Sequence, residues 1–134
     1  MSVNTVPRFV EQPKSWAIRL PAVTTAATVT GGGNTRTLLT AAANGSKIEY
    51  LRFQSLSDTI ASRFFVFLMT ANNTFHLYED LAVSAASSPG GTVEAVTLEI
   101  TPTKPIHLQA DWQLRVGAST NTADFACFAS GGDY

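Results

Sequence analysis

Charged side chains are scarce in this chain of 134 residues. Only 14% of the residues are Asp, Glu, Lys or Arg, and the formal net charge is −1, whereas typical globular domains contain ~25% charged residues. A nearly neutral chain excludes a strongly basic nucleic-acid-binding surface and an acidic solvating tail. We therefore expect no nucleic-acid partner. We also expect other copies or a partner protein to cover part of the surface.

Cysteine and long apolar runs are also nearly absent. Cys127 is the only cysteine, which excludes an intrachain disulfide and fits assembly in a reducing cytosol. The longest apolar run, Phe64–Met69, is far shorter than the ~20 residues that a membrane-spanning helix requires. The N-terminus lacks the apolar core of a secretory signal. We therefore expect no membrane association.

No arrangement of residues typical of an enzyme is present. His76 and His107 stand alone, without the clustered ligands of a metal site. Glu79 and Asp80 are adjacent, so on a strand they would point to opposite faces and could not act as paired carboxylates. Neither a Gly-x-Ser-x-Gly elbow nor a complete phosphate-binding loop occurs. The sequence therefore predicts a protein that is not an enzyme, with no catalytic residues, no metal and no cofactor.

Residues 23–134 have the composition and spacing of an all-β domain. Thr, Val and Phe are abundant, and no window shows the 3.6-residue periodicity of an amphipathic helix. The length predicts one domain, and short strands separated by turns predict an antiparallel β-sandwich, with a jelly roll as the expected form. The predicted strands are Val23–Thr30, Arg36–Thr40, Ser46–Gln54, Ser62–Thr70, Thr74–Val83, Val93–Ile100, Ile106–Gln109, Gln113–Ala118 and Phe125–Ser130.

Residues 1–22 differ from the rest of the chain. They contain Pro7, Pro13 and Pro21, half of the six prolines. Proline favours extended backbone and cannot donate to a strand ladder. We therefore predict an extended N-terminal arm that docks on a partner surface. An arm that lies back on its own domain is an equally weighted alternative.

The run Arg63–Met69 is apolar on both faces. One face carries Phe65, Phe67 and Met69, and the side chains that alternate with them are also apolar. Because a strand in a two-layer sandwich has only one core face, the second face needs a cover. We predict that this cover is a subunit interface or the docked arm, and a local loop of the same chain is the alternative.

Two further patterns concern the strand faces. Ile48 and Tyr50 share one face of their segment and Phe53 lies on the other, which predicts a β-bulge or a corner between two sheets. Trp112 alternates in phase with the apolar residues that follow it, so it is predicted to lie in the core. Tyr78 lies between polar neighbours and is the better candidate for an exposed aromatic side chain.

The segments Thr101–Leu108, Trp112–Arg115 and Phe125–Tyr134, together with Asn44–Ile48 and the phenylalanine-rich run near Phe67, form a recognisable pattern. The pattern resembles small proteins encoded in the virion-structure gene clusters of tailed phages and prophages. The resemblance covers roughly residues 36–134, and its motifs are structural rather than catalytic. One turn departs from the family pattern, which often has Pro-x-Gly before the tryptophan; this chain has Gln109-Ala110-Asp111.

The resemblance implies a head decoration, or cement, protein. Such proteins are commonly β-sandwiches or jelly rolls, are often trimeric, and bind the capsid at threefold or quasi-threefold positions. The implied partners are the major capsid protein and further copies of the chain, and the implied location is the virion surface after synthesis in the host cytoplasm. We expect the arm to contact the capsid through Val6, Pro7, Arg8, Phe9, Val10 and Trp16.

A second function stays open at this point. Sandwiches commonly carry ligand sites on their loops, so the alternative is a carbohydrate- or receptor-binding module of a phage tail or fibre. Tyr78 and His76 are the ligand-binding residues predicted for it.

Overall fold

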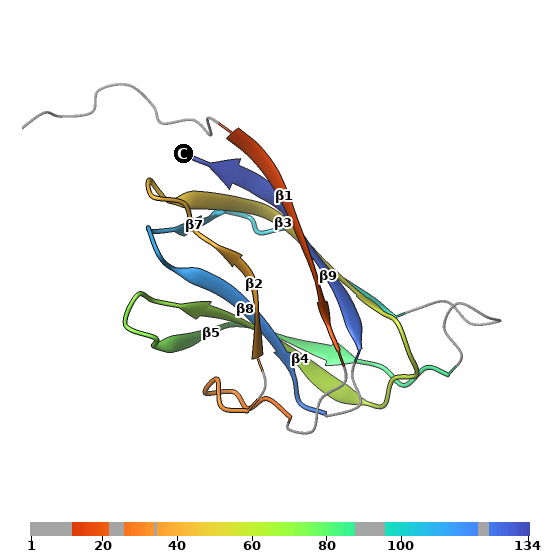
Figure 1. Cartoon of the computed structure of the whole chain (residues 1–134). Helices are drawn as coiled ribbons and strands as arrows, with labels where there is room; N and C mark the ends of the chain where they lie inside the picture. The colour runs from red at the N-terminus through yellow and green to blue at the C-terminus, as the bar shows by residue number, and fades with distance from the viewer. Residues whose placement is uncertain (1–11, 22–25, 34, 88–95, 121–123) are drawn as a thin grey trace, which may run out of the picture.

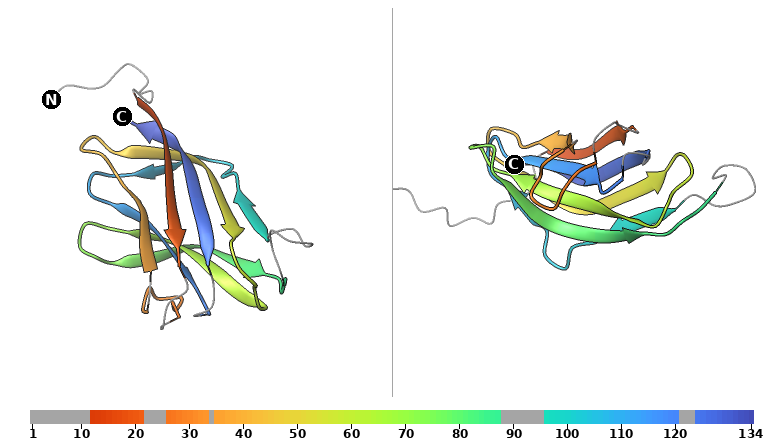
Figure 2. Two further views of the ribbon diagram at one scale, coloured as in Figure 1. Left: turned by 45° about the vertical axis from the view of Figure 1, so that its right-hand side comes forward. Right: turned by 90° about the horizontal axis from the view of Figure 1, so that it is seen from below.

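The computed structural model describes residues 12–21, 26–33, 35–87, 96–120 and 124–134. These residues form nine β-strands and no helix, arranged in two antiparallel sheets that pack face to face (Figures 1 and 2). The prediction of an all-β antiparallel sandwich is therefore confirmed. No helix long and apolar enough to cross a membrane is found among these residues.

The strands divide into two sheets. The five-stranded sheet has the order β1-β9-β3-β6, and β7 also pairs with β3. Its strands are β1 (Gln12–Leu20), β3 (Ser46–Ser55), β6 (Thr97–Ile100), β7 (Ile106–Leu108) and β9 (Phe125–Asp133). The four-stranded sheet has the order β2-β8-β4-β5. Its strands are β2 (Thr35–Thr40), β4 (Ser62–Met69), β5 (Phe75–Val83) and β8 (Gln113–Ala118).

The strand pairings are nested around the β4–β5 hairpin. β3 pairs with β6 and β7, β2 pairs with β8, and β1 pairs with β9. One long hairpin closed between β4 and β5 would contain all of these pairs. Rolling this hairpin over itself adds the two remaining pairings, β9 with β3 and β8 with β4.

The core lies between the two sheets and has an aromatic centre. The ring centroid of Phe64 lies 4.5 Å from that of Phe53 and 4.9 Å from that of Phe125. All three side chains are fully buried, and burial of each stabilises the fold by roughly 1.5–3 kcal/mol relative to exposure. Trp112 packs against the same cluster, in agreement with its predicted core position.

The predicted N-terminal arm requires a correction over residues 12–20. These residues form β1, which pairs with β9 along its whole length, and Trp16 and Ile18 pack against the core. The segment therefore lies back on its own domain, because its apolar residues recur with a period of two. Pro13 is tolerated because β1 is an edge strand. The other predicted arm contacts lie outside the described residues: Val6, Pro7, Arg8, Phe9 and Val10.

Several predicted strand ends differ from the structure, and β9 continues to Asp133, past the predicted end at Ser130. Val23–Thr30 is wrong where it is described, because residues 26–30 form a loop with a turn. Gly31 N–H donates to Thr28 O at 3.0 Å, and Gly31 has a φ of +90°, so the backbone turns where a strand was expected. Val93–Ile100 begins as a strand only at Thr97, and residues 93–95 lie outside the described ranges.

Bulges interrupt the alternation of two strands. The pairing of β3 with β9 shifts between Ile48 and Tyr50, so the predicted change of phase there is confirmed as a bulge. A second shift leaves Tyr78 of β5 without a partner on β4. As a result, Leu81 packs against the core whereas Phe75 lies on the outer face of the sheet.

Candidate binding surfaces

The outer face of the four-stranded sheet is covered by the chain itself. Phe65 and Phe67 are 3% and 0% exposed, and they pack against Ala27 and the half-buried Phe75. The ring centroids of Phe67 and Phe75 are 5.8 Å apart in an edge-to-face arrangement. Ala27 N–H donates to Ala118 O at 2.8 Å, which fixes the loop of residues 26–33 beside β8 (Figure 1).

This arrangement corrects the predicted subunit interface at Phe65, Phe67 and Met69. All three side chains are buried within a single chain. The loop that contains Ala27 covers this face together with Phe75. A local loop of the same chain was the alternative to a subunit interface. Both faces of β4 are therefore covered, as predicted, but a second subunit is not required to cover them.

The outer face of the five-stranded sheet is open by contrast. Phe128 of β9 is 42% exposed. The register places it between Ala17 of β1 and Arg52 of β3, and Arg52 is opposite Glu99 of β6. A shallow hollow of about 350 Å³ lies over this row, and its lining residues are Ser15, Trp16, Ala17, Tyr50, Arg52, Phe128, Ala129 and Ser130.

The polar groups of this face are only partly satisfied. Arg52 Nε lies 3.9 Å from Glu99 Oε1, which is close enough for an ion pair but too long for a hydrogen bond. The Nε atom is buried, and it forms no hydrogen bond with the described residues. Desolvation raises the pKa of Tyr50, with a further contribution from Glu99. The face therefore combines two aromatic rings with a half-buried guanidinium group.

The other predicted ligand residues lie on β5. Tyr78 is 36% exposed at the bulge, and His76 is also exposed. Desolvation, followed by the charge of Glu79, raises the pKa of Tyr78. The hollow over Phe128 lies on the other sheet, so the structure separates these residues from it. Phe128 is not among the residues predicted from the sequence, although it alternates there with Cys127 and Ala129, which are buried.

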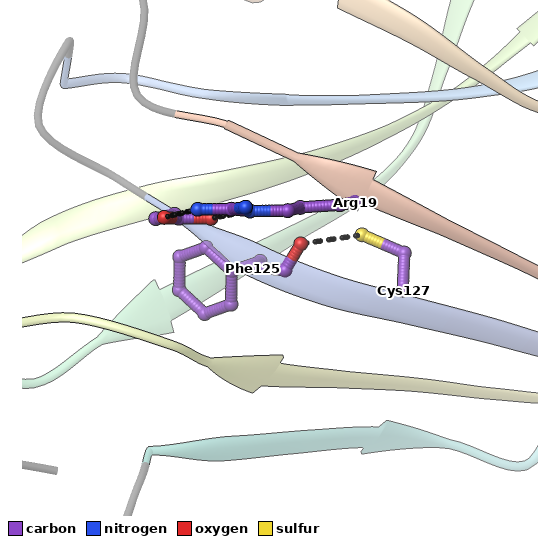
Figure 3. Close-up of polar contacts among 4 residues, drawn as sticks. Arg19, Phe125 and Cys127 are labelled. Atoms are coloured by element: carbon purple, nitrogen blue, oxygen red, sulfur yellow. Dashed lines mark hydrogen bonds and ion pairs between the residues drawn. The ribbon is translucent and has the colours of Figure 1, made fainter.

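The residues that the structure describes contain neither a metal centre nor a reactive thiol. The described ranges contain no cluster of His, Cys, Asp or Glu that could hold a metal ion. Cys127 points toward the carbonyl oxygen of Phe125, with Sγ 3.9 Å from that oxygen (Figure 3). Burial raises the pKa of its thiol to about 12, so the thiolate that would act as a nucleophile is nearly absent at neutral pH.

Comparisons with known proteins identify no relative of this chain. No family model matches it, and no similar protein was found among curated proteins or among solved structures. The surfaces described above are therefore the structural basis for a functional proposal.

Proposed function

We propose that this protein is a non-enzymatic structural subunit that decorates the surface of a tailed-phage capsid. The observation that carries the proposal is the open face of the five-stranded sheet, where the exposed Phe128 lies beside Tyr50 and Arg52. Aromatic residues and arginine are enriched at the centres of protein interfaces. The resemblance to virion proteins supports the major capsid protein as the partner and the virion surface as the location.

A cement subunit requires binding and no chemistry. A protein that binds the assembled shell, but not its separated subunits, lowers the free energy of the shell by mass action. Contacts repeated around a symmetric shell add avidity to a weak single contact. An open docking face on a rigid sandwich is sufficient for this role.

The nested strand pairing supports the jelly-roll form of this sandwich. A jelly roll distributes a folded-over hairpin between two sheets, and the pairs of β1 with β9 and of β2 with β8 fit that description. Jelly rolls are common in viral capsid proteins. The topology is therefore compatible with a place on a virion, although the fold does not by itself establish function.

A homo-oligomer is the second element of the proposal. The resemblance supports a trimer, which would match the local threefold positions of a capsid. A closed symmetric oligomer presents one copy of the docking face for each subunit. Several copies would then bind neighbouring capsid sites at once.

The experiment is co-sedimentation of the full chain with capsids of the phage that encodes it. The wild-type chain is expected to sediment with capsids and to raise the temperature at which they break open. Phe128→Ser is expected to weaken binding at least tenfold, as for a central interface residue. Tyr78→Ser is the matched control, because Tyr78 is a similarly exposed aromatic residue on the other sheet. Failure of the wild-type chain to sediment with capsids would overturn the proposal.

One observation also favours the carbohydrate-binding alternative. The ring of Phe128 is partly open to solvent, and Ser15 and Ser130 line the same hollow. An exposed ring beside hydroxyl groups is a platform on which a sugar can stack, and jelly rolls include lectin domains. A glycan array separates the readings: binding lost in Phe128→Ala supports this site, and binding lost in Tyr78→Ala supports the site with His76. An array without binding removes the alternative.

A further inference from the structure

The two edge strands of the four-stranded sheet carry opposite charges. β2 forms one edge and β5 the other, and within the described part of the chain neither has a strand on its outer side. Such edges present unpaired backbone N–H and C=O groups to a further strand. Arg36 lies on β2, whereas β5 carries Glu79 and Asp80, the only adjacent acidic pair in the chain.

A hollow of about 660 Å³ lies along the positive edge. Its lining residues are Ile18, Arg19, Leu20, Thr35, Arg36, Thr37 and Arg115, with no acidic residue among them. Arg19 is neutralised, because Nε and Nη2 lie 2.9 and 2.7 Å from the two carboxylate oxygens of Asp124 (Figure 3). Arg36 and Arg115 have no carboxylate partner among the described residues. Two positive charges therefore remain uncompensated at this edge.

Neutral groups hold Arg115 in place across β2. Its Nε donates to Thr35 Oγ1 at 3.0 Å, its Nη1 to Thr37 Oγ1 at 2.6 Å, and its Nη2 to Thr35 O at 2.9 Å. Nη1 also lies 3.0 Å from Gln113 Oε1. Desolvation lowers the pKa of Arg115. These contacts fix the guanidinium without neutralising it, and a partly buried cation without a counter-charge is unfavourable until an anion approaches.

The two edges offer two pairs of opposite charges, Arg36 with Glu79 and Arg115 with Asp80. The first pair lies on the core side of the sheet. Arg36 is opposite Val116 of β8, and Glu79 is opposite Val66 of β4. Both valines are fully buried in the core. Residues directly opposite each other in a sheet share a face, so Arg36 and Glu79 lie on the same side of it.

The second pair lies on the outer side. Asp80 is opposite Phe65, and Arg115 is opposite Phe67, and both phenylalanines belong to the outer cluster. Asp80 already forms an ion pair with Arg63, whose Nε lies 2.7 Å from its carboxylate, so its charge is compensated as that of Arg19 is. The charges of the two edges are therefore complementary chiefly on the core side, through Arg36 and Glu79.

Strand direction is compatible with pairing of the two edges. All pairings in the sheet are antiparallel, so direction alternates along β2-β8-β4-β5 and β2 runs opposite to β5. We propose that β5 of one copy pairs antiparallel with β2 of a second copy, placing Glu79 beside Arg36 and Asp80 beside Arg115. In this register Asp80 lies opposite Thr35, the first residue of β2, and the part of β5 before Glu79, with the bulge at Tyr78, lies opposite the rest of β2. Such a head-to-tail contact forms a ring when the rotation closes.

This inference rests on the homo-oligomer proposed above and names its interface. The test is sedimentation velocity of the full chain over a range of concentrations, with Arg36→Glu, Glu79→Arg and the double variant. Each single reversal is expected to raise the dissociation constant at least tenfold, because like charges then oppose each other. The double variant is expected to restore assembly, because every interface again contains an opposite pair. Lys104→Glu, an exposed loop position, is the control and should assemble as the wild type does.

The outcomes separate this inference from the proposed function. A wild-type chain that stays monomeric, or an oligomer that tolerates both single reversals, would overturn the interface. So would a double variant that fails to reassemble while its circular dichroism and unfolding temperature match the wild type. A monomer that still sediments with capsids would leave the decoration role standing alone. If the chain is monomeric and Arg36→Glu loses capsid binding, the hollow beside Arg36 would instead be a binding site for the capsid.

Discussion

Ser46 on β3 donates a 2.7 Å hydrogen bond to Oδ1 of Asp133 on β9, 87 residues further along the chain. Lys14 on β1 forms an ion pair with the other oxygen of the same carboxylate. Ser46 Oγ also accepts the backbone N–H of Ala42 at 3.0 Å. A single buried carboxylate therefore links three neighbouring strands of the five-stranded sheet at one end.

Asp133→Asn is expected to destabilise the fold at neutral pH and to weaken its dependence on acid. Lys14 and then Ser46 lower the pKa of Asp133. A carboxylate with a lowered pKa adds stability above its unfolded pKa of about 3.9, and this stability is lost as the pH falls through the folded value. Urea unfolding should show a loss of about 1–3 kcal/mol at pH 7, and this loss should shrink at an acid pH below the unfolded pKa of about 3.9.

Asp111→Asn is the control for this variant, because Asp111 is exposed in a turn with a φ of +66°, which Asn also tolerates. It should unfold like the wild type at both pH values. An Asp133→Asn variant with an unchanged unfolding free energy at pH 7 would mean that the carboxylate link contributes no net stability.

Gly31→Ala is expected to loosen the loop that covers the outer face of the four-stranded sheet. A Cβ at Gly31 would lie 2.4 Å from Cγ of Phe75, and the φ of +90° disfavours any L side chain. The expected loss of unfolding free energy is about 1–3 kcal/mol. Gly32→Ala is the control, since its Cβ would meet only the hydroxyl of Thr28, at 3.0 Å. Equal unfolding free energies for the two variants would contradict the packing of this loop.

Phe67→Ala is expected to destabilise the single chain rather than only its assembly. Phe67 is fully buried between Phe65 and Phe75, and truncation of such a side chain typically costs about 3–5 kcal/mol. Leu77→Ala, at a position 40% exposed on the neighbouring strand, should stay within about 0.5 kcal/mol of the wild type. A Phe67→Ala variant that unfolds normally but fails to oligomerise would restore the interface that the structure argues against.

Cys127 is expected to be unreactive toward thiol reagents in the folded protein. With a thiol pKa of about 12, the thiolate fraction at about pH 8 is on the order of one in ten thousand, and burial blocks access as well. A chromogenic disulfide reagent should therefore detect one thiol per chain only after denaturant is added. Rapid labelling of the native protein would show that β9 opens or that the core is not packed as described.

The fold class and most strand positions could be predicted from the sequence. Gln113–Ala118 was predicted with its observed bounds, and the phase change near Ile48 located a real bulge. These features depend on the period-two alternation of buried and exposed side chains, which is local information. The prediction failed over Val23–Thr30, where β-branched residues suggested a strand but Gly31 turns the chain into a covering loop.

The candidate surfaces were much harder to predict. The sequence marked the second apolar face of β4, but it did not show whether a loop or another subunit covers Phe65. It also did not show that Arg52 and Phe128 are neighbours, because 75 positions of chain separate these two partners in the β3–β9 pairing. Contacts between residues so distant in the chain follow from strand order, which alternation does not encode.

The sequence alone determined that this chain forms strands, that it offers no set of residues typical of catalysis, and that apolar surface must be covered on both sides of β4. Only the tertiary structure decided what covers that surface and which face stays open. The physical reason is that hydrophobic burial is non-directional: Phe67 gains as much from Phe75 and the loop with Ala27 as it would from a second subunit. The pairing of the strands places Phe67 against Phe75 and this loop, and it leaves Phe128 exposed on the other sheet.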